Sequence, residues 1–168
     1  MAQREAAFDI GDYRVSISRM SEHDLLEVVE MELTCGLSPW GWDAYHHELG
    51  QGSAAIMLVA ATDGKALEQG HRLAGFIVAR VIADELHVNN VAVRPELCRH
   101  GIGASLLRAV LERAKRQGSV SAWLEVRAGN QAAQTLYERC GFQIAGRRRN
   151  YYHQPVEDAL IMKATIGL

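Results

Sequence analysis

The chain has 168 residues, of which 48% are hydrophobic and 23% charged, a size and balance typical of one globular domain. This composition excludes a disordered tail, a coiled-coil rod and a collagen-like repeat. Eighteen Lys and Arg against twenty Asp and Glu give a formal charge of −2, which argues against a general nucleic-acid binder because such proteins are normally basic.

The cysteines and the N-terminal residues indicate where in the cell the protein is expected. Cys35, Cys98 and Cys140 cannot all pair with one another and show no C-x-x-C spacing, so we expect reduced thiols in a cytoplasmic protein. Residues 1–12 are expected to be a flexible lead-in, and they lack the apolar stretch of a signal peptide. The longest apolar runs are strand-sized, too short to span a bilayer. We therefore expect one domain over residues 1–168 that has no membrane partner.

The first half of the chain predicts a strand, two helices and two further strands. Val15 and Ile17 alternate with polar residues in a strand over 14–19. Ser21 then caps a helix whose apolar side chains recur at helical spacing. After a break rich in Gly and Pro, we expect a short helix and two apolar strands over residues 43–49, 55–61 and 73–82.

The next strand, over residues 84–93, changes the parity of its apolar side chains. Leu86 and Val88 share one face, whereas Val91 and the valine two residues later belong to the other. The change falls at Asn89–Asn90 and predicts a β-bulge that splays the strand there. Bulges are common beside active sites, so this position is a candidate site.

The last third of the chain predicts helices that alternate with strands, which implies a mixed α/β fold. On one of these strands, Trp123, Glu125 and Arg127 occupy one face and apolar residues the other. The expected segments are a helix over 101–117, a strand over 121–127, a helix over 131–140, and strands over 142–149 and 157–164.

A turn between strand and helix is the strongest local signal for a ligand. Gly101 and Gly103 let the backbone approach a ligand closely, and the helix start offers unpaired N–H groups and a positive dipole end. Arg99 and His100 add positive character, so the turn predicts a phosphate or pyrophosphate site. It lacks the third glycine of a dinucleotide-binding motif and the Gly-Lys-Ser/Thr of a P-loop. A tight turn that simply needs small residues is the alternative.

This turn resembles motif A of the GNAT superfamily of acyl-CoA N-acyltransferases, whose pattern is Q/R-x-x-G-x-G/A. Gly101 and Gly103 match, whereas Cys98 stands where the family usually has Gln or Arg. The segments that resemble motif B are 123–130, 136–138 and 141–142. The resemblance implies a central, mixed but mostly antiparallel sheet, splayed at the bulge and flanked by about four helices.

Within that superfamily, further segments are similar to the RimI-type ribosomal-protein-alanine N-acetyltransferases. They are Pro39–Trp40, Leu124–Arg127, Arg148–Tyr152 and Glu157–Ala159 with Met162. Enzymes of that type acetylate the N-terminal alanine of small-subunit ribosomal protein eighteen. The resemblance therefore implies acetyl-CoA as co-substrate, the N-terminal peptide of that ribosomal protein as partner, and direct attack in a ternary complex. The acceptor is expected between residues 39–49 and 149–152.

The same resemblance assigns roles to individual residues. Glu125 is the expected general base, and Tyr137 is the expected acid that protonates the departing CoA thiolate. The backbone of Val91, Ala92 and Val93 is expected to pair with pantetheine, which the side-chain amide of Asn130 would also hold. The expected pyrophosphate cradle consists of the backbone amides of Arg99, His100, Gly101, Ile102, Gly103 and Ala104.

The residues alone also fit simpler roles. Glu125 fits an exposed strand residue in a surface ion pair, and Asn130 fits the N-cap of the following helix. Tyr137 fits an aromatic that packs beside Leu136. Two other functions stay open: acetylation of a small amine or another protein N-terminus, and acyl-CoA binding without catalysis. A pure binder would need neither Glu125 nor Tyr137.

Three further expectations concern partners. Seven histidines include His46-His47, but no His/Cys cluster has metal-ligand spacing, so no metal is expected. Arg147, Arg148 and Arg149 would alternate faces in a strand and form no continuous basic stripe, so no nucleic-acid partner is expected. A monomer is expected.

Overall fold

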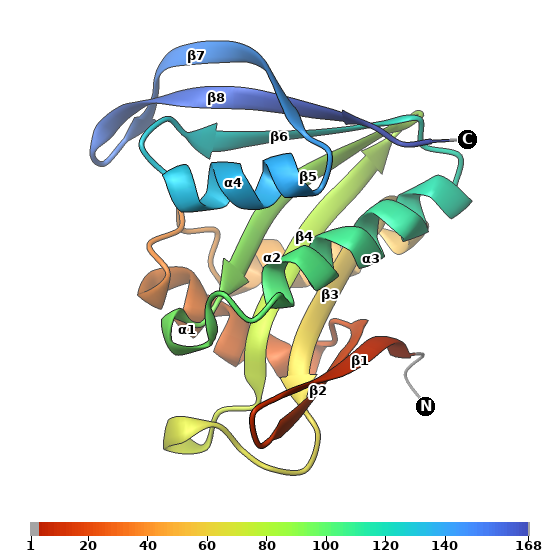
Figure 1. The fold of residues 1–168 in the computed structure, drawn as a ribbon, viewed down its shortest axis with the longest axis vertical. Helices are drawn as coiled ribbons and strands as arrows, with labels where there is room; N and C mark the ends of the chain where they lie inside the picture. The colour runs from red at the N-terminus through yellow and green to blue at the C-terminus, as the bar shows by residue number, and fades with distance from the viewer. Residues whose placement is uncertain (1–3, 168) are drawn as a thin grey trace.

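Eight strands form one sheet in the order β1-β2-β3-β4-β5-β6-β8-β7 in the computed structural model, which describes residues 4–167 (Figure 1). Within these residues β5 and β6 are the one parallel pair, and every other neighbouring pair is antiparallel. This confirms the predicted mixed, mostly antiparallel sheet. The strands are β1 Arg4–Ile10, β2 Tyr13–Arg19, β3 Ala55–Thr62, β4 Leu73–Ile82, β5 Glu85–Val93, β6 Ser121–Arg127, β7 Gln143–His153 and β8 Val156–Thr165.

Helices cover both faces of this sheet, and each layer buries its own apolar cluster. In Figure 1, α3 and α4 lie in front of the sheet and α1 and α2 behind it. The apolar face of α3 packs into the first cluster with Leu106 and Val110, and α1 packs into the second with Leu25 and Val28. The helices are α1 Leu25–Thr34, α2 Trp42–Leu49, α3 Ile102–Arg116 and α4 Gln131–Arg139.

The N-terminal segment corrects one expectation. Residues 4–10 form strand β1 and are not a flexible lead-in. Phe8 and Ile10 pack against the core, and Glu5 bonds to Arg113 and Arg116 of α3, at 2.7 and 3.3 Å. Backbone pairing with β2 and these ion pairs hold a segment that is polar in composition. Residues 1–3 of the expected lead-in lie outside the described residues.

The predicted bulge in β5 is confirmed, and it opens the sheet. Val78 of β4 pairs with Asn90 and Ala79 with Val88, so Asn89 is the extra residue. The parallel pairing of β5 with β6 stops at Val88, although β6 stays paired with β8 as far as Arg127. Beyond the bulge the two strands therefore diverge, and the segment 91–93 keeps strand pairing with β4 alone.

Within residues 4–167, none of the helices combines the length and the apolar character that a membrane crossing requires.

Candidate active site

A cleft of about 350 Å³ lies where β5 and β6 diverge. One wall is the loop over residues 35–41, which connects α1 to α2, and the others come from β5, β6, α4 and the end of β7. Four predicted site residues line this cleft: Val91, Glu125, Asn130 and Tyr137. The bulge thus brings the open strand edge together with a carboxylate and a phenol that follow it by more than 30 residues in sequence.

Glu125 reaches the cleft because side chains alternate along β6. Its neighbours Leu124 and Val126 are buried in the core, so Glu125 points to the opposite face. Arg148 Nε lies 2.9 Å from Glu125 Oε1. A hydrogen bond with Glu125, together with partial burial, raises the pKa of Tyr151. The carboxylate is therefore both a cleft residue and a member of the ion pair that the simpler interpretation expected.

Tyr137 approaches the cleft from α4 and is almost completely buried. Its ring packs 6.1 Å from that of Phe142. Burial, with smaller contributions from Tyr152 and Cys140, raises the pKa of Tyr137 to about 12. Burial likewise raises the pKa of Tyr152 to about 12, with Glu125 as the next cause. Both phenols therefore hold their protons at neutral pH.

The turn before α3 has the geometry of an anion cradle. Gly101 has φ of 82° and Arg99 has φ of 66°, so both adopt the left-handed conformation. In the described part of the chain, the amides of Arg99, His100 and Gly101 donate to no protein acceptor. Those of residues 102–104 belong to the first turn of α3, where a helix supplies no acceptor. Six consecutive amides are thus available to a ligand.

Other residues of this turn have structural roles. A Cβ at Gly103 would lie 3.1 Å from Leu136 Cδ2, so close packing of α3 on α4 requires a small residue there. The His100 ring turns back onto the loop, with Nδ1 3.0 Å from the carbonyl oxygen of Cys98. The His100 side chain, which was expected to add positive character to the turn, therefore faces its own backbone. Asn130 caps α4, since its Oδ1 accepts from Ala133 N at 3.1 Å, which leaves the side-chain NH₂ to donate.

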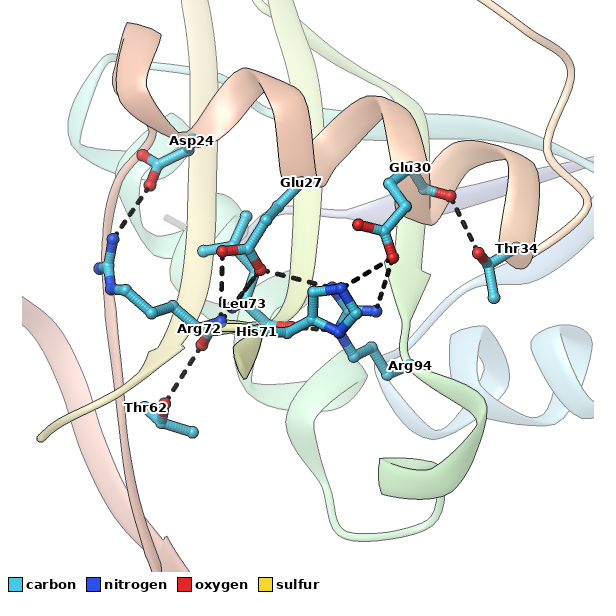
Figure 2. A network of polar contacts seen from close by, with 9 residues as sticks. All are labelled: Asp24, Glu27, Glu30, Thr34, Thr62, His71, Arg72, Leu73 and Arg94. Atoms are coloured by element: carbon cyan, nitrogen blue, oxygen red, sulfur yellow. Dashed lines mark hydrogen bonds and ion pairs between the residues drawn. The ribbon is translucent and has the colours of Figure 1, made fainter. Parts of the chain in front are cut away.

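Arg94, which precedes the cradle turn, was not singled out by its sequence pattern. It is 3% exposed, and carboxylates of α1 hold it (Figure 2). Arg94 Nη2 lies 3.3 Å from Glu27 Oε2, Nη1 lies 3.5 Å from Glu30 Oε1, and Nε donates to Leu73 O at 2.7 Å. Glu27 also accepts from the backbone amide of Leu73 at 2.9 Å. The end of β5, the start of β4 and α1 are therefore tied together immediately before the cradle.

Glu32 is a second residue that the sequence analysis missed. It is 1% exposed and bonds to the loop that forms one cleft wall. A signal existed in its spacing, because it follows Val28 by four residues on the buried face of α1, where a carboxylate needs hydrogen-bond partners. Among residues 4–167, no three His, Cys, Asp or Glu side chains gather as a metal site would require.

Comparisons with known proteins show what the chain is similar to. The acetyltransferase (GNAT) family matches residues 25–142. A Salmonella typhimurium protein named [ribosomal protein bS18]-alanine N-acetyltransferase is 36% identical over 155 residues, which cover 91% of this chain and 99% of that protein. The protein of the same name from Escherichia coli is 33% identical, with the same coverage. The crystal structure of the Escherichia coli ribosomal-protein-S18-alanine N-acetyltransferase superposes with a TM-score of 0.78 over 92% of this chain and 95% of that one.

Proposed function

Because the chain belongs to the GNAT family of acetyltransferases, we propose that its acceptor is the N-terminal alanine of ribosomal protein bS18. The chain is an acetyltransferase that takes its acetyl group from acetyl-CoA. The observation that carries the proposal is the cleft at the bulge, which combines an open strand edge with Glu125 and Tyr137. The named acceptor of the relatives at 33–36% identity supports this choice.

The proposed donor subsite consists of backbone groups at the opening of the sheet and at the start of α3. Among them, Val93 O already accepts from the thiol of Cys35 at 3.4 Å. The edge of β5 over Val91, Ala92 and Val93 can pair with the amides of pantetheine, as an added strand would. The side-chain NH₂ of Asn130 is a further donor beside that edge. The six amides from Arg99 to Ala104, at the positive end of α3, suit a pyrophosphate.

In the proposed reaction Glu125 accepts a proton from the α-amino group, whose ordinary pKa is near 8. The neutral nitrogen then forms the C–N bond to the acetyl carbonyl carbon, and the C–S bond breaks. Tyr137, whose raised pKa of about 12 keeps its proton in place at neutral pH, donates that proton to the departing thiolate. The second proton of the attacking nitrogen leaves as the amide forms and returns to the Tyr137 oxygen, and Glu125 releases its proton to solvent. No covalent intermediate on the protein is needed, so both substrates are bound at once.

The proposed acceptor path runs between the loop over residues 35–41 and the tyrosines Tyr151 and Tyr152, whose rings lie 5.1 Å apart. A flexible chain end fits such a path, and a small first residue lets its nitrogen approach the thioester within about 3–3.5 Å. All of these residues come from one chain, so the proposal requires only a monomer. A ribosomal acceptor implies a cytoplasmic location.

The test is mass spectrometry of a short peptide that begins Ala-Arg, incubated with the protein and acetyl-CoA. We expect one acetyl group on the free α-amine and none on a control peptide that has a blocked N-terminus and an internal Lys. Transfer to the internal Lys, or no transfer by a protein that still binds acetyl-CoA, would overturn the proposed acceptor. The latter result would favour a small amine, or a module that only binds acyl-CoA.

A pair of variants tests the proposed acceptor path. Replacing both Tyr151 and Tyr152 by Ala should raise KM for the peptide far more than KM for acetyl-CoA, because both rings line the cleft away from the cradle turn. An equal rise in the two KM values would contradict this path.

A further inference from the structure

Glu32 is a buried carboxylate that is satisfied by hydrogen bonds. Tyr45 Oη donates to Glu32 Oε2 at 2.6 Å, and the backbone amide of Trp40 donates to the same oxygen at 2.9 Å. The amide of Gly41 donates to Oε1 at 3.2 Å. A buried charge is costly unless such donors surround it, so these three groups and the carboxylate fix one another.

These bonds hold the loop that forms one wall of the cleft. The carbonyl oxygen of Glu32 accepts from the amide of Leu37 at 3.0 Å, in addition to the amides of Trp40 and Gly41 on its carboxylate. A single residue of α1 therefore binds three amides of the loop over residues 35–41. Five residues of that loop line the cleft: Cys35, Gly36, Leu37, Ser38 and Trp40.

The same network reaches the bulged strand. Asn90 Nδ2 donates to Tyr45 Oη at 2.9 Å, and Asn90 directly follows the extra residue of the bulge. The Tyr45 ring is fully buried, 5.3 Å from the ring of Trp40 and edge-on to Phe76 at 5.9 Å. The chain of contacts from Asn90 through Tyr45 and Glu32 to Trp40 thus sets the separation between the open edge of β5 and the loop opposite it.

We propose that Glu32 is a positioning residue that sets the affinity for the acceptor chain end, with Tyr45 and Asn90 as its links to β5. This rests on the proposed function, since it assumes that the acceptor lies along the loop. The cradle turn is held separately, because Arg94 before it is fixed by Glu27 and Glu30 and not by Glu32. Because β5 is also held by its pairing with β4, we expect loss of the Glu32 contacts to displace the loop and so to affect the acceptor much more than the donor.

The Glu32→Gln variant tests this directly. Gln keeps the shape but places an NH₂ donor where one carboxylate oxygen faces N–H or O–H donors, so part of the loop anchoring is lost. We expect KM for the Ala-Arg peptide to rise about tenfold or more, while KM for acetyl-CoA stays within about twofold. Hydrogen exchange of a proteolytic fragment that covers the loop should become faster, because the amides of Trp40 and Gly41 lose acceptor strength.

Matched variants complete the experiment. Tyr45→Phe removes one hydroxyl and keeps the ring, so it should raise the peptide KM in the same direction, by about threefold. If thermal melting shows that Glu32→Gln does not fold, Tyr45→Phe is used in its place. The controls are Glu68→Gln, on the exposed connection between β3 and β4, and Tyr13→Phe on β2. Both should match the wild type.

The outcomes separate the two proposals. If the wild type acetylates the peptide but the variants keep its peptide KM, or raise both KM values equally, Glu32 has no positioning role and the proposed function stands. If the wild type transfers nothing to the peptide, the proposed acceptor fails. In that case unchanged hydrogen exchange in Glu32→Gln would also overturn the anchoring of the loop, and faster exchange would retain it.

Discussion

Glu125 and Tyr137 line one cleft in different electrostatic surroundings. Glu125 has a side chain that is 30% exposed and lies beside the Arg148 guanidinium. Tyr137 is enclosed by α4 and the core, next to Phe142. A partly solvated carboxylate can pass a proton to water, whereas a buried phenol keeps its proton at neutral pH and gives it up only as the C–S bond breaks beside it. The two environments suit a base and an acid, respectively.

The role of Glu125 is tested by Glu125→Gln. We expect kcat to fall by about 10²–10⁴-fold, the usual contribution of a positioned base, while affinity for acetyl-CoA is unchanged. Release of the CoA thiol measures kcat, and calorimetric titration measures affinity. The matched control is Glu68→Gln, which should behave as wild type. A kcat within a fewfold of the wild-type value would contradict the role of Glu125 as general base and leave it only its ion pair with Arg148.

The pH dependence of kcat tests Tyr137. Its pKa in the folded protein is raised to about 12, so the phenol keeps its proton below that value and loses it only as pH rises through it. Between pH 7 and 10 the acid is therefore fully protonated, and kcat should show no alkaline fall caused by Tyr137. Tyr137→Phe should lower kcat across this whole range. A descending limb near pH 10 that disappears in Tyr137→Phe would contradict the raised pKa.

At this scale the sequence predicts side chains whose direction follows from a simple period. Glu125 lies between two apolar residues of a strand, and alternation alone sends it away from the core. The orientation of His100 could not be predicted, because its contact with the Cys98 carbonyl depends on the left-handed turn around it. The partners of Glu32 could not be predicted for a related reason: two are backbone amides of a loop without periodicity, and the third is the Tyr45 hydroxyl on another helix.

Among the elements, α1 is the one whose carboxylates hold both the residue before the cradle turn and the loop that forms one wall of the cleft. Glu27 and Glu30 hold Arg94 before the cradle, as Figure 2 shows, and Glu32 holds the loop over residues 35–41. The helix therefore fixes the position of the donor turn relative to the opposite wall.

The Arg94 contacts give a prediction at this scale. Arg94→Met keeps the bulk but leaves Glu27 facing backbone amides alone, so the free energy of unfolding should fall by roughly 3 kcal/mol. KM for acetyl-CoA should also rise, because the cradle turn loses an attachment. Chemical denaturation and steady-state kinetics measure the two effects. Arg14→Met, at an exposed pair with Asp9, is the control and should change neither. A similar small effect of both variants would show that Arg94 does not hold the turn.

Strand β5 illustrates what a pattern can predict for an element, and β7 what it cannot. The parity change located the bulge to within one residue, because a buried sheet enforces alternation on both sides of it. The end of β7 was predicted four residues too early. Asn150, with φ of 50°, interrupts the pairing, and the strand resumes at Tyr152 opposite Glu157. The return to pairing depends on the position of β8, so the local sequence of β7 does not predict it.

For the whole molecule, the correction at the N-terminus changes what truncation should do. Deleting residues 2–10 removes β1 with the core contacts of Phe8 and Ile10 and the ion pairs of Glu5. We expect the melting temperature to fall by at least about 5 °C, whereas a flexible lead-in would be dispensable. Glu5→Gln should lower it less, and Asp12→Asn, at an exposed pair with Lys65, should leave it unchanged. An unaltered melting temperature of the truncated protein would show that β1 contributes nothing to stability.

The opening between β5 and β6 has a consequence for how the protein behaves without its substrates. A sheet that separates in its middle has inner edges in addition to the outer ones, and the segment 91–93 is such an edge. Unpaired strand edges are templates on which other extended chains assemble. A donor molecule that pairs with the edge of β5, as proposed, would therefore also block this route to aggregation. We expect the protein to stay dispersed on prolonged storage when CoA is present and to self-associate more readily when it is removed.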